Sequence, residues 1–200
     1  MSYLLSVSRA ALMALILAPT LLLSDQAFAA EPSAGYVGAD IGLHSNYGTR
    51  DLNSRIYGGY HLGRTEAFGK ENDHAVELAL FTLGSRYDDW RYISSGAPVY
   101  SKAKASGMAV TSASSLHLSE RWTLDSRVGV SYTHSRAYYA DDGQATQTWN
   151  SVNLVAGVGL SYRLDRHWAA TLDYAYTPYQ VFRDTRVSNT MLSAGLAYHF

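Results

Sequence analysis

The sequence predicts an all-β protein: a closed, eight-stranded, antiparallel, up-and-down β-barrel that spans a membrane. Three observations carry this prediction. Eight segments alternate with a period of two, no amphipathic helical stripe follows residue 33, and aromatic residues collect at the ends of the apolar faces. In chain order, the segments are residues 35–47, 52–62, 74–84, 106–118, 122–134, 151–164, 168–177 and 191–200.

The first thirty residues carry a separate export signal. Arg9 precedes an apolar run that ends at Leu23, and the small residues Ala27 and Ala29 stand where a signal peptidase requires them. The run is shorter than the roughly 20 apolar residues of a membrane-spanning helix. We therefore expect residues 1–29 to be a cleaved signal peptide, and residues 30–200 to form one barrel domain.

The composition of the chain argues against several function classes. A formal net charge of −1 gives no basic surplus for binding nucleic acid. The absence of cysteine removes disulfides and thiolate metal sites. The seven histidines show no HxH or HxxxH spacing, and the glycines match no phosphate-binding motif. We expect no metal site and no cofactor.

In each of the first four segments, one parity is apolar. In 35–47 it includes Val37 and Ile41, and in 52–62 it includes Ile56. Segment 74–84 sets Val76, Leu78 and Leu80 against a parity made of Ala75, Glu77, Ala79 and Phe81. Segment 106–118 is the weakest, because serines dilute the apolar face.

The last four segments alternate more clearly. Leu124, Val128 and Val130 share a parity in 122–134, and 151–164 places glycines opposite its valines and leucines. Segment 168–177 opposes aromatic residues to Asp173. The chain ends on an alternating strand that closes with Phe200. These patterns are typical of strands with one apolar face.

The polar parity is small and sparsely charged, unlike the solvated surface of a soluble β-sandwich, which is the alternative fold. Because buried charges persist only when compensated, we expect its acids and arginines to form an ion-pair network in the lumen. The aromatic residues form girdles, with six at one end and Tyr47, Tyr132 and Tyr176 at the other. The predicted network consists of Asp40, Arg55, Glu77, Asp125, Arg127, Arg163 and Asp173. The six girdle residues are Tyr60, Trp122, Tyr162, Trp168, Tyr198 and Phe200.

The connections should alternate between short periplasmic turns and long external loops. Residues 119–121 and 165–167 suit short turns, whereas 85–105, 138–148 and 177–186 are long and polar. Two connections break the pattern. The expected turn at 63–73 is long, and the expected loop at 47–51 is brief.

The mature chain resembles the small eight-stranded outer-membrane β-barrels of Gram-negative bacteria, the OmpA-like, OmpX-like and opacity-protein group. The resemblance rests on "YVGADIG", "IYGGYHLG", "AVELALFTLGS", "SRVGVSYTHS", "GVGLSYRL", "WAATLDYAYT" and "GLAYHF". It implies a place in the cell outer membrane, contact with outer-membrane lipids and lipopolysaccharide, and a monomer. It also implies that Tyr198 and Phe200 are the assembly signal read by the barrel-assembly machinery.

No catalytic set emerges from the sequence. Outer-membrane lipid A deacylases carry His and Ser two residues apart, but His44 and Ser45 are adjacent, and "HLSE" at 117–120 falls at a predicted periplasmic turn. We expect a non-enzymatic structural or adhesion-like protein with a side-chain-filled lumen. The alternatives are a narrow ion channel or a lipid A-modifying enzyme. An external protein or glycan would meet Trp90, Arg91, Tyr92, Lys102 and Lys104.

Overall fold

A computed structural model describes residues 35–46, 49–92, 98–139, 146–182 and 185–200, with side chains for 35–43, 52–83, 104–136, 148–180 and 188–200. The regular structure in these ranges is β-strand, and none of them contains a helix able to cross a membrane. The strands are β1 (Gly35–Asn46), β2 (Thr49–Ala67), β3 (Lys70–Tyr92), β4 (Pro98–His117), β5 (Trp122–Tyr139), β6 (Thr146–Arg163), β7 (Trp168–Tyr176), β8 (Tyr179–Phe182), β9 (Thr185–Val187) and β10 (Thr190–His199).

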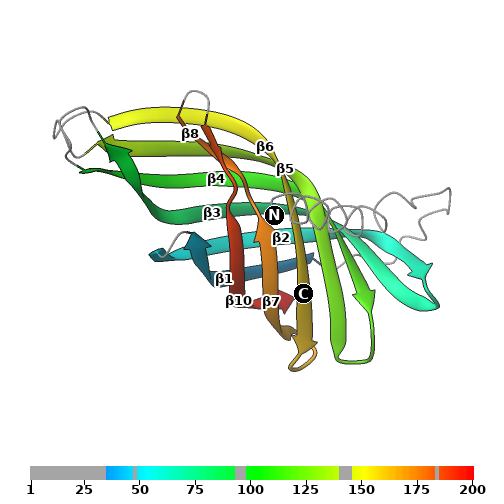
Figure 1. The fold of residues 1–200 in the computed structure, drawn as a ribbon. Coiled ribbons are helices and arrows are strands. Elements are labelled where there is room, and N and C mark those ends of the chain that lie inside the picture. Colours follow the sequence, from blue (N-terminus) through cyan, green and yellow to red (C-terminus); the bar gives the residue numbers. More distant parts are fainter. Residues whose placement is uncertain (1–34, 47–48, 93–97, 140–145, 183–184) are drawn as a thin grey trace, which may run out of the picture.

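Eight of these strands close into a barrel in the order β1-β10-β7-β6-β5-β4-β3-β2, which confirms the predicted fold class (Figure 1). Closure depends on the pairing of the first strand with the last, in which Tyr36 lies opposite His199 and Leu43 opposite Leu192. All neighbouring strands are antiparallel.

The register fixes the shape of the barrel. The register partners lead from His61 of β2 across each neighbouring strand, once around the barrel. The path returns to β2 at Asp51, ten residues from its start. Ten residues of about 3.3 Å, set against eight strand spacings of about 4.8 Å, tilt the strands by about 40°. A barrel of this size has an interior that side chains can fill.

The apolar parity faces outward, as predicted. Val37, Ile41 and Leu43 are half exposed, whereas Asp40 between them is 2 % exposed. The same contrast holds on β3, where Leu78 is exposed and Glu77 is buried. The outside of the barrel is therefore an apolar wall, and polar side chains line the inside.

The two ends of the barrel differ. The turn end carries the connections 68–69, 118–121 and 164–167 together with Gly35 and Phe200. The loop end carries the remaining connections and the β8–β9 hairpin. At the turn end the predicted girdle is present: ring centroids lie 4.8 Å apart for Trp122 and Tyr162, and 5.1 Å apart for Trp168 and Tyr198. Tyr47, predicted for the opposite girdle, lies outside the described residues.

The predicted loop connections contain more strand than expected. Residues 85–92 and 98–105 extend β3 and β4, and 138–139 and 146–148 extend β5 and β6, so the loop prediction was wrong for these residues. The rest of the predicted loops, 93–97 and 140–145, lies outside the described residues. Residues 177–186 include the small β8–β9 hairpin. The physical reason is that a strand with water on both faces loses its apolar alternation and then resembles a loop in sequence.

The connection 63–73 is also corrected. β2 and β3 run to a two-residue turn at Phe68 and Gly69, whose φ angles are 55° and 69°. Positive φ at both positions matches the right-handed twist of a two-residue hairpin. A bulge between His61 and Gly63 shifts the register on the way. The long predicted turn is therefore a strand extension, whereas the connection after β1 is brief, as predicted.

The two short turns at 118–121 and 164–167 are confirmed, and each is held by one side chain. The Ser119 hydroxyl accepts the backbone N–H groups of Arg121 and Trp122 at 3.4 and 3.2 Å. The Asp165 carboxylate accepts those of His167 and Trp168, both at 2.7 Å. These N–H groups hold the pKa of the Asp165 carboxyl below its usual value, because they favour the ionised form.

Candidate functional site in the barrel lumen

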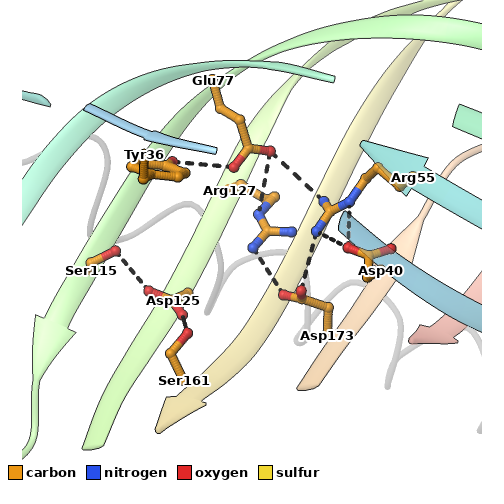
Figure 2. Close-up of polar contacts among 9 residues, drawn as sticks. All are labelled: Tyr36, Asp40, Arg55, Glu77, Ser115, Asp125, Arg127, Ser161 and Asp173. Carbon is orange, nitrogen blue, oxygen red and sulfur yellow. Dashed lines mark hydrogen bonds and ion pairs between the residues drawn. The ribbon is translucent and has the colours of Figure 1, made fainter. Parts of the chain in front are cut away.

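An ion-pair network crosses the middle of the lumen (Figure 2). The Arg55 guanidinium lies 2.6 Å from the Asp40 carboxylate and 3.1 Å from Asp173. The Arg127 guanidinium lies 2.9 Å from Asp173, which therefore bridges the two arginines. Glu77 lies farther away, 3.7 Å from Arg55 and 3.9 Å from Arg127. Five strands contribute, so the network ties opposite walls of the barrel together.

Two tyrosines complete this network, and the sequence reasoning missed both. The Tyr36 hydroxyl donates a hydrogen bond of 3.2 Å to Glu77. The Tyr57 ring lies under the Arg55 guanidinium, 4.5 Å from its centroid. Both residues stand on the polar parity of their segments, and that parity was the available signal.

Two of the seven predicted members lie outside the ion-pair network. Asp125 accepts hydrogen bonds from Ser115, at 2.7 Å, and from Ser161, with no ion pair to it among the described residues (Figure 2). Arg163 is exposed, and no ion pair joins it to another described residue. It is the last residue of β6, where solvent at the barrel mouth can hydrate its charge.

An apolar layer closes the lumen on the loop-end side of the network. Phe81, Leu83, Val155 and two alanines pack there with Tyr179 of β8, which is 2 % exposed. The Gln180 N–H donates to Ser151 Oγ at 3.3 Å, and the Ser135 hydroxyl donates to the Gln180 carbonyl. The β8–β9 hairpin is thus anchored over the lumen.

A polar vestibule opens on the other side of the network, at the turn end. It encloses about 460 Å³. The Tyr36 ring lies between His61 and His199, at centroid distances of 5.4 and 5.6 Å. His117 contacts Asp73 at 2.9 Å. Four histidines line this space, namely His61, His117, His167 and His199.

Only an indirect signal for this grouping of histidines is present in the sequence. His61, His117 and His199 lie on three different strands and His167 lies in the turn before β7, so no short motif joins the four. Each stands within a few residues of a strand end that the predicted topology assigns to the same side. Among the described residues, no set of three or more histidines or acids is arranged to hold a metal.

The predicted surface contacts are only partly described. Trp90, Arg91 and Tyr92 lie in the backbone of β3 and Lys102 in that of β4, but their side chains are outside the described set. Lys104 is described and is exposed. All five residues belong to strand extensions at the loop end.

The described histidine–serine motif, at 117–120, does not bring a nucleophile and a base together. His117 bonds Asp73 in the vestibule, whereas Ser119 holds the adjacent turn. His44 and Ser45 are successive residues of β1, and their side chains lie outside the described residues. At the C-terminus, the Phe200 N–H donates to the Gly35 carbonyl at 3.1 Å, so the predicted assembly signal is part of the closing seam.

Comparisons with known proteins agree with this architecture. Residues 15–200 match the family model described as "Outer membrane protein beta-barrel domain". Outer membrane protein A of Serratia marcescens is 32 % identical over 103 residues, which are 48 % of this chain and 29 % of that protein. This chain therefore matches less than a third of the length of that relative.

Two solved structures share the fold. Neisserial surface protein A aligns with a TM-score of 0.51 at 16 % identity, over 85 % of this chain and 98 % of its own. A major outer membrane protein of Thermus thermophilus aligns with a TM-score of 0.50 at 16 % identity, over 85 % of this chain and 100 % of its own. At these identities the likeness concerns the fold alone.

Proposed function

This chain belongs to the outer membrane protein beta-barrel domain family and resides in the cell outer membrane, and from that premise we propose that it is a non-enzymatic surface protein with a structural or recognition role. In this proposal, the barrel anchors an extended sheet outside the membrane. The sheet recognises an external protein or glycan.

The observation that carries this proposal is the length of four strands. β3, β4, β5 and β6 contain 23, 20, 18 and 18 residues. About 9–11 residues suffice to cross a bilayer. Pairing continues into the extensions, with Tyr87 opposite Lys102 and Lys102 opposite Tyr138. A paired sheet loses less conformational entropy on binding than a free loop would, which suits recognition.

The filled lumen also supports this role. An ion-pair network, an apolar layer and the anchored β8–β9 hairpin stand in series along the axis. A solute would have to break charge–charge contacts and displace Tyr179. A diffusion pore is therefore the less favoured activity.

The recognition role is tested by shortening one hairpin. Deleting residues 86–103 and joining the ends by a short turn keeps Lys104 and the lumen-lining pair Leu83 and Ala105. We expect cells that carry the shortened protein to lose binding to immobilised matrix proteins or to a glycan array. The Phe68→Asn variant, changed at the turn end, is the control and should bind as the parent does. Equal binding by the shortened protein, with heat-modifiable migration intact, would refute the recognition role.

A narrow ion channel is the second candidate, and the vestibule favours it. This cavity reaches Arg127 and Glu77, and the network, the apolar layer and the β8–β9 hairpin separate it from the loop end. Rearranged ion pairs and a displaced hairpin would open such a path. Discrete conductance in planar bilayers that increases in a Tyr179→Ala variant would support this candidate, and silent bilayers with both proteins would exclude it.

A further inference from the structure

Two cations stand side by side on the outer wall of the barrel. Lys104 of β4 lies directly opposite Arg136 of β5, and both side chains are exposed. Side chains opposite each other on one face of a sheet have Cβ atoms about 4.5–5.5 Å apart, and like charges there are destabilising. Among the described residues, no carboxylate pairs with either cation. Within the described part of the chain, the pair therefore lacks an anion.

Arg136 is held in place by its neighbours. Its Nε donates to His134 Nε2 at 3.2 Å, and His134 Nδ1 lies 2.8 Å from Asn150 Oδ1. Because Nε2 accepts a hydrogen bond, Nδ1 carries the proton and donates to the Asn150 oxygen. Among the described residues, no other hydrogen bond to the guanidinium of Arg136 is present, so its outer N–H groups can meet a ligand.

A groove of about 480 Å³ begins next to this pair and crosses β4, β3 and β2. Its apolar side is formed by Met108, Leu80 and Ile56, which are register partners on successive strands. Its other side carries a matching row of small residues, Ser106, Thr82 and Ser54, two residues along each strand.

The row of small residues leaves room for an apolar ligand in the groove. Larger side chains at these three positions would fill the groove. The Ser54 and Thr82 hydroxyls bond each other at 2.8 Å, so their polar atoms need no partner from the occupant. Lys104 lies two residues before Ser106 on the same face of β4, so the cations and the groove form one continuous surface.

We propose that this surface binds one phosphorylated lipid of the membrane leaflet that surrounds the loop end. The phosphate lies between Lys104 and Arg136, and one acyl chain occupies the groove. A lipid is the occupant because the groove lies on the apolar wall that meets hydrocarbon, whereas Lys104 lies next to it at the start of the strand extension. A phosphate fits because guanidinium and ammonium groups bind its oxygens through charge-assisted hydrogen bonds. The proposal is independent of any external ligand.

The test uses the processed chain refolded in phosphatidylcholine nanodiscs, titrated with diphosphorylated lipid A and analysed by native mass spectrometry. We expect the Lys104→Gln, Arg136→Gln double variant to bind about tenfold more weakly, which corresponds to about 1.4 kcal/mol. The matched control is Lys70→Gln, Arg166→Gln, which removes two exposed cations at the turn end and should bind as the parent does. Equal losses in both double variants would overturn the site.

A second variant tests the groove. Ser106→Leu places a larger side chain in it and should weaken lipid A binding severalfold, while heat-modifiability reports that the barrel has folded. If Ser106→Leu does not fold, Ser106→Val takes its place. Unchanged binding in the groove variant, together with full displacement of the lipid by inorganic phosphate, would reduce the site to an anion site and overturn the lipid proposal. Binding to external ligands is measured separately on cells, so the two proposals can fail independently.

Discussion

At the residue scale, the decisive feature is an imbalance of charge in the lumen. Three carboxylates, Asp40, Glu77 and Asp173, face two guanidiniums, Arg55 and Arg127. All five side chains are at most 11 % exposed. Because a buried charge without compensation is costly, the arginines limit the stability of the network.

Arg127→Gln should therefore destabilise the barrel more than Asp173→Asn does. Losing Arg127 leaves three carboxylates with one cation, and we expect a cost of about 3–5 kcal/mol. Asp173→Asn leaves two carboxylates facing two guanidiniums, so the loss in the free energy of unfolding should be smaller. Urea unfolding in lipid vesicles, followed by tryptophan fluorescence, measures both. Equal costs, or the reverse order, would show that charge balance does not govern this site.

A glycine next to Asp173 makes room for its carboxylate. A Cβ atom at Gly159 would collide with the Asp173 Oδ1 atom and lie 3.1 Å from its Cγ. We expect Gly159→Ala to push the carboxylate away from Arg127 and to cost about 1–3 kcal/mol in the same unfolding assay.

Gly58 is the matched control for that change. A Cβ atom there meets nothing closer than 3.6 Å, which is an ordinary contact. Gly58→Ala should leave stability unchanged or raise it slightly, because glycine loses more conformational freedom on folding. A large loss at Gly58, or none at Gly159, would contradict this account.

At the element scale, the hairpins at the turn end are fixed by local chemistry. Phe68 occupies a left-handed conformation and is 88 % exposed, so it gains no packing in return for its strain. Ser119 and Asp165 hold the other two turns through backbone N–H groups. The conformation of these turns can therefore be tested by single substitutions.

Phe68→Asn should stabilise the β2–β3 hairpin. Placing a non-glycine residue in the left-handed region costs roughly 1–2 kcal/mol of conformational energy, and this energy is lower for asparagine than for phenylalanine. We expect slower amide hydrogen exchange at Glu66 and Glu71, which pair across the hairpin. Gly69→Ala, at φ 69°, should accelerate exchange at the same amides. Unchanged exchange in both variants would show that the turn conformation does not limit this hairpin.

The β6–β7 turn should depend on pH. Since Asp165 has a lowered pKa in the folded protein, its contribution is fully present above the unfolded pKa of about 3.9 and is lost as pH falls through the lower folded value. Exchange at the Trp168 amide should therefore become faster, relative to Asp165→Asn, as the pH is lowered through this range. A parallel pH profile in the parent and in Asp165→Asn would rule out the carboxylate as the cause.

At the scale of the whole molecule, the barrel divides into functionally different parts along its axis. A ten-residue stagger over eight strands leaves an interior that the ion-pair network and the apolar layer fill, with the vestibule open at the turn end. The strand extensions stand at the other end (Figure 1). Closure and extension together make the strand extensions the place for the proposed recognition.

The orientation in the membrane can be tested directly, because the chain has no cysteine. Ser188→Cys lies at the loop end and Phe68→Cys at the turn end, and both positions are exposed. We expect a membrane-impermeant maleimide to label Ser188→Cys on intact cells, and to label Phe68→Cys only after the outer membrane is permeabilised. The opposite pattern would invert the topology and place the extensions in the periplasm.

Several features of the fold and of the lumen could be predicted from the sequence, and others could not. The period of two placed Asp40, Arg55, Glu77, Arg127 and Asp173 inside the barrel, because alternation alone decides which face a strand residue occupies. It missed the strand extensions at 85–92 and 98–105, since water on both faces removes the alternation.

By itself, the sequence determined the fold class, the apolar outer wall and the membership of the inner face, because each depends on spacing along one strand. The tertiary structure alone decided which charges meet, which histidines share the vestibule, and that Tyr179 closes the lumen while Lys104 faces Arg136. These contacts depend on the register between strands and on the ten-residue stagger, which no single strand encodes.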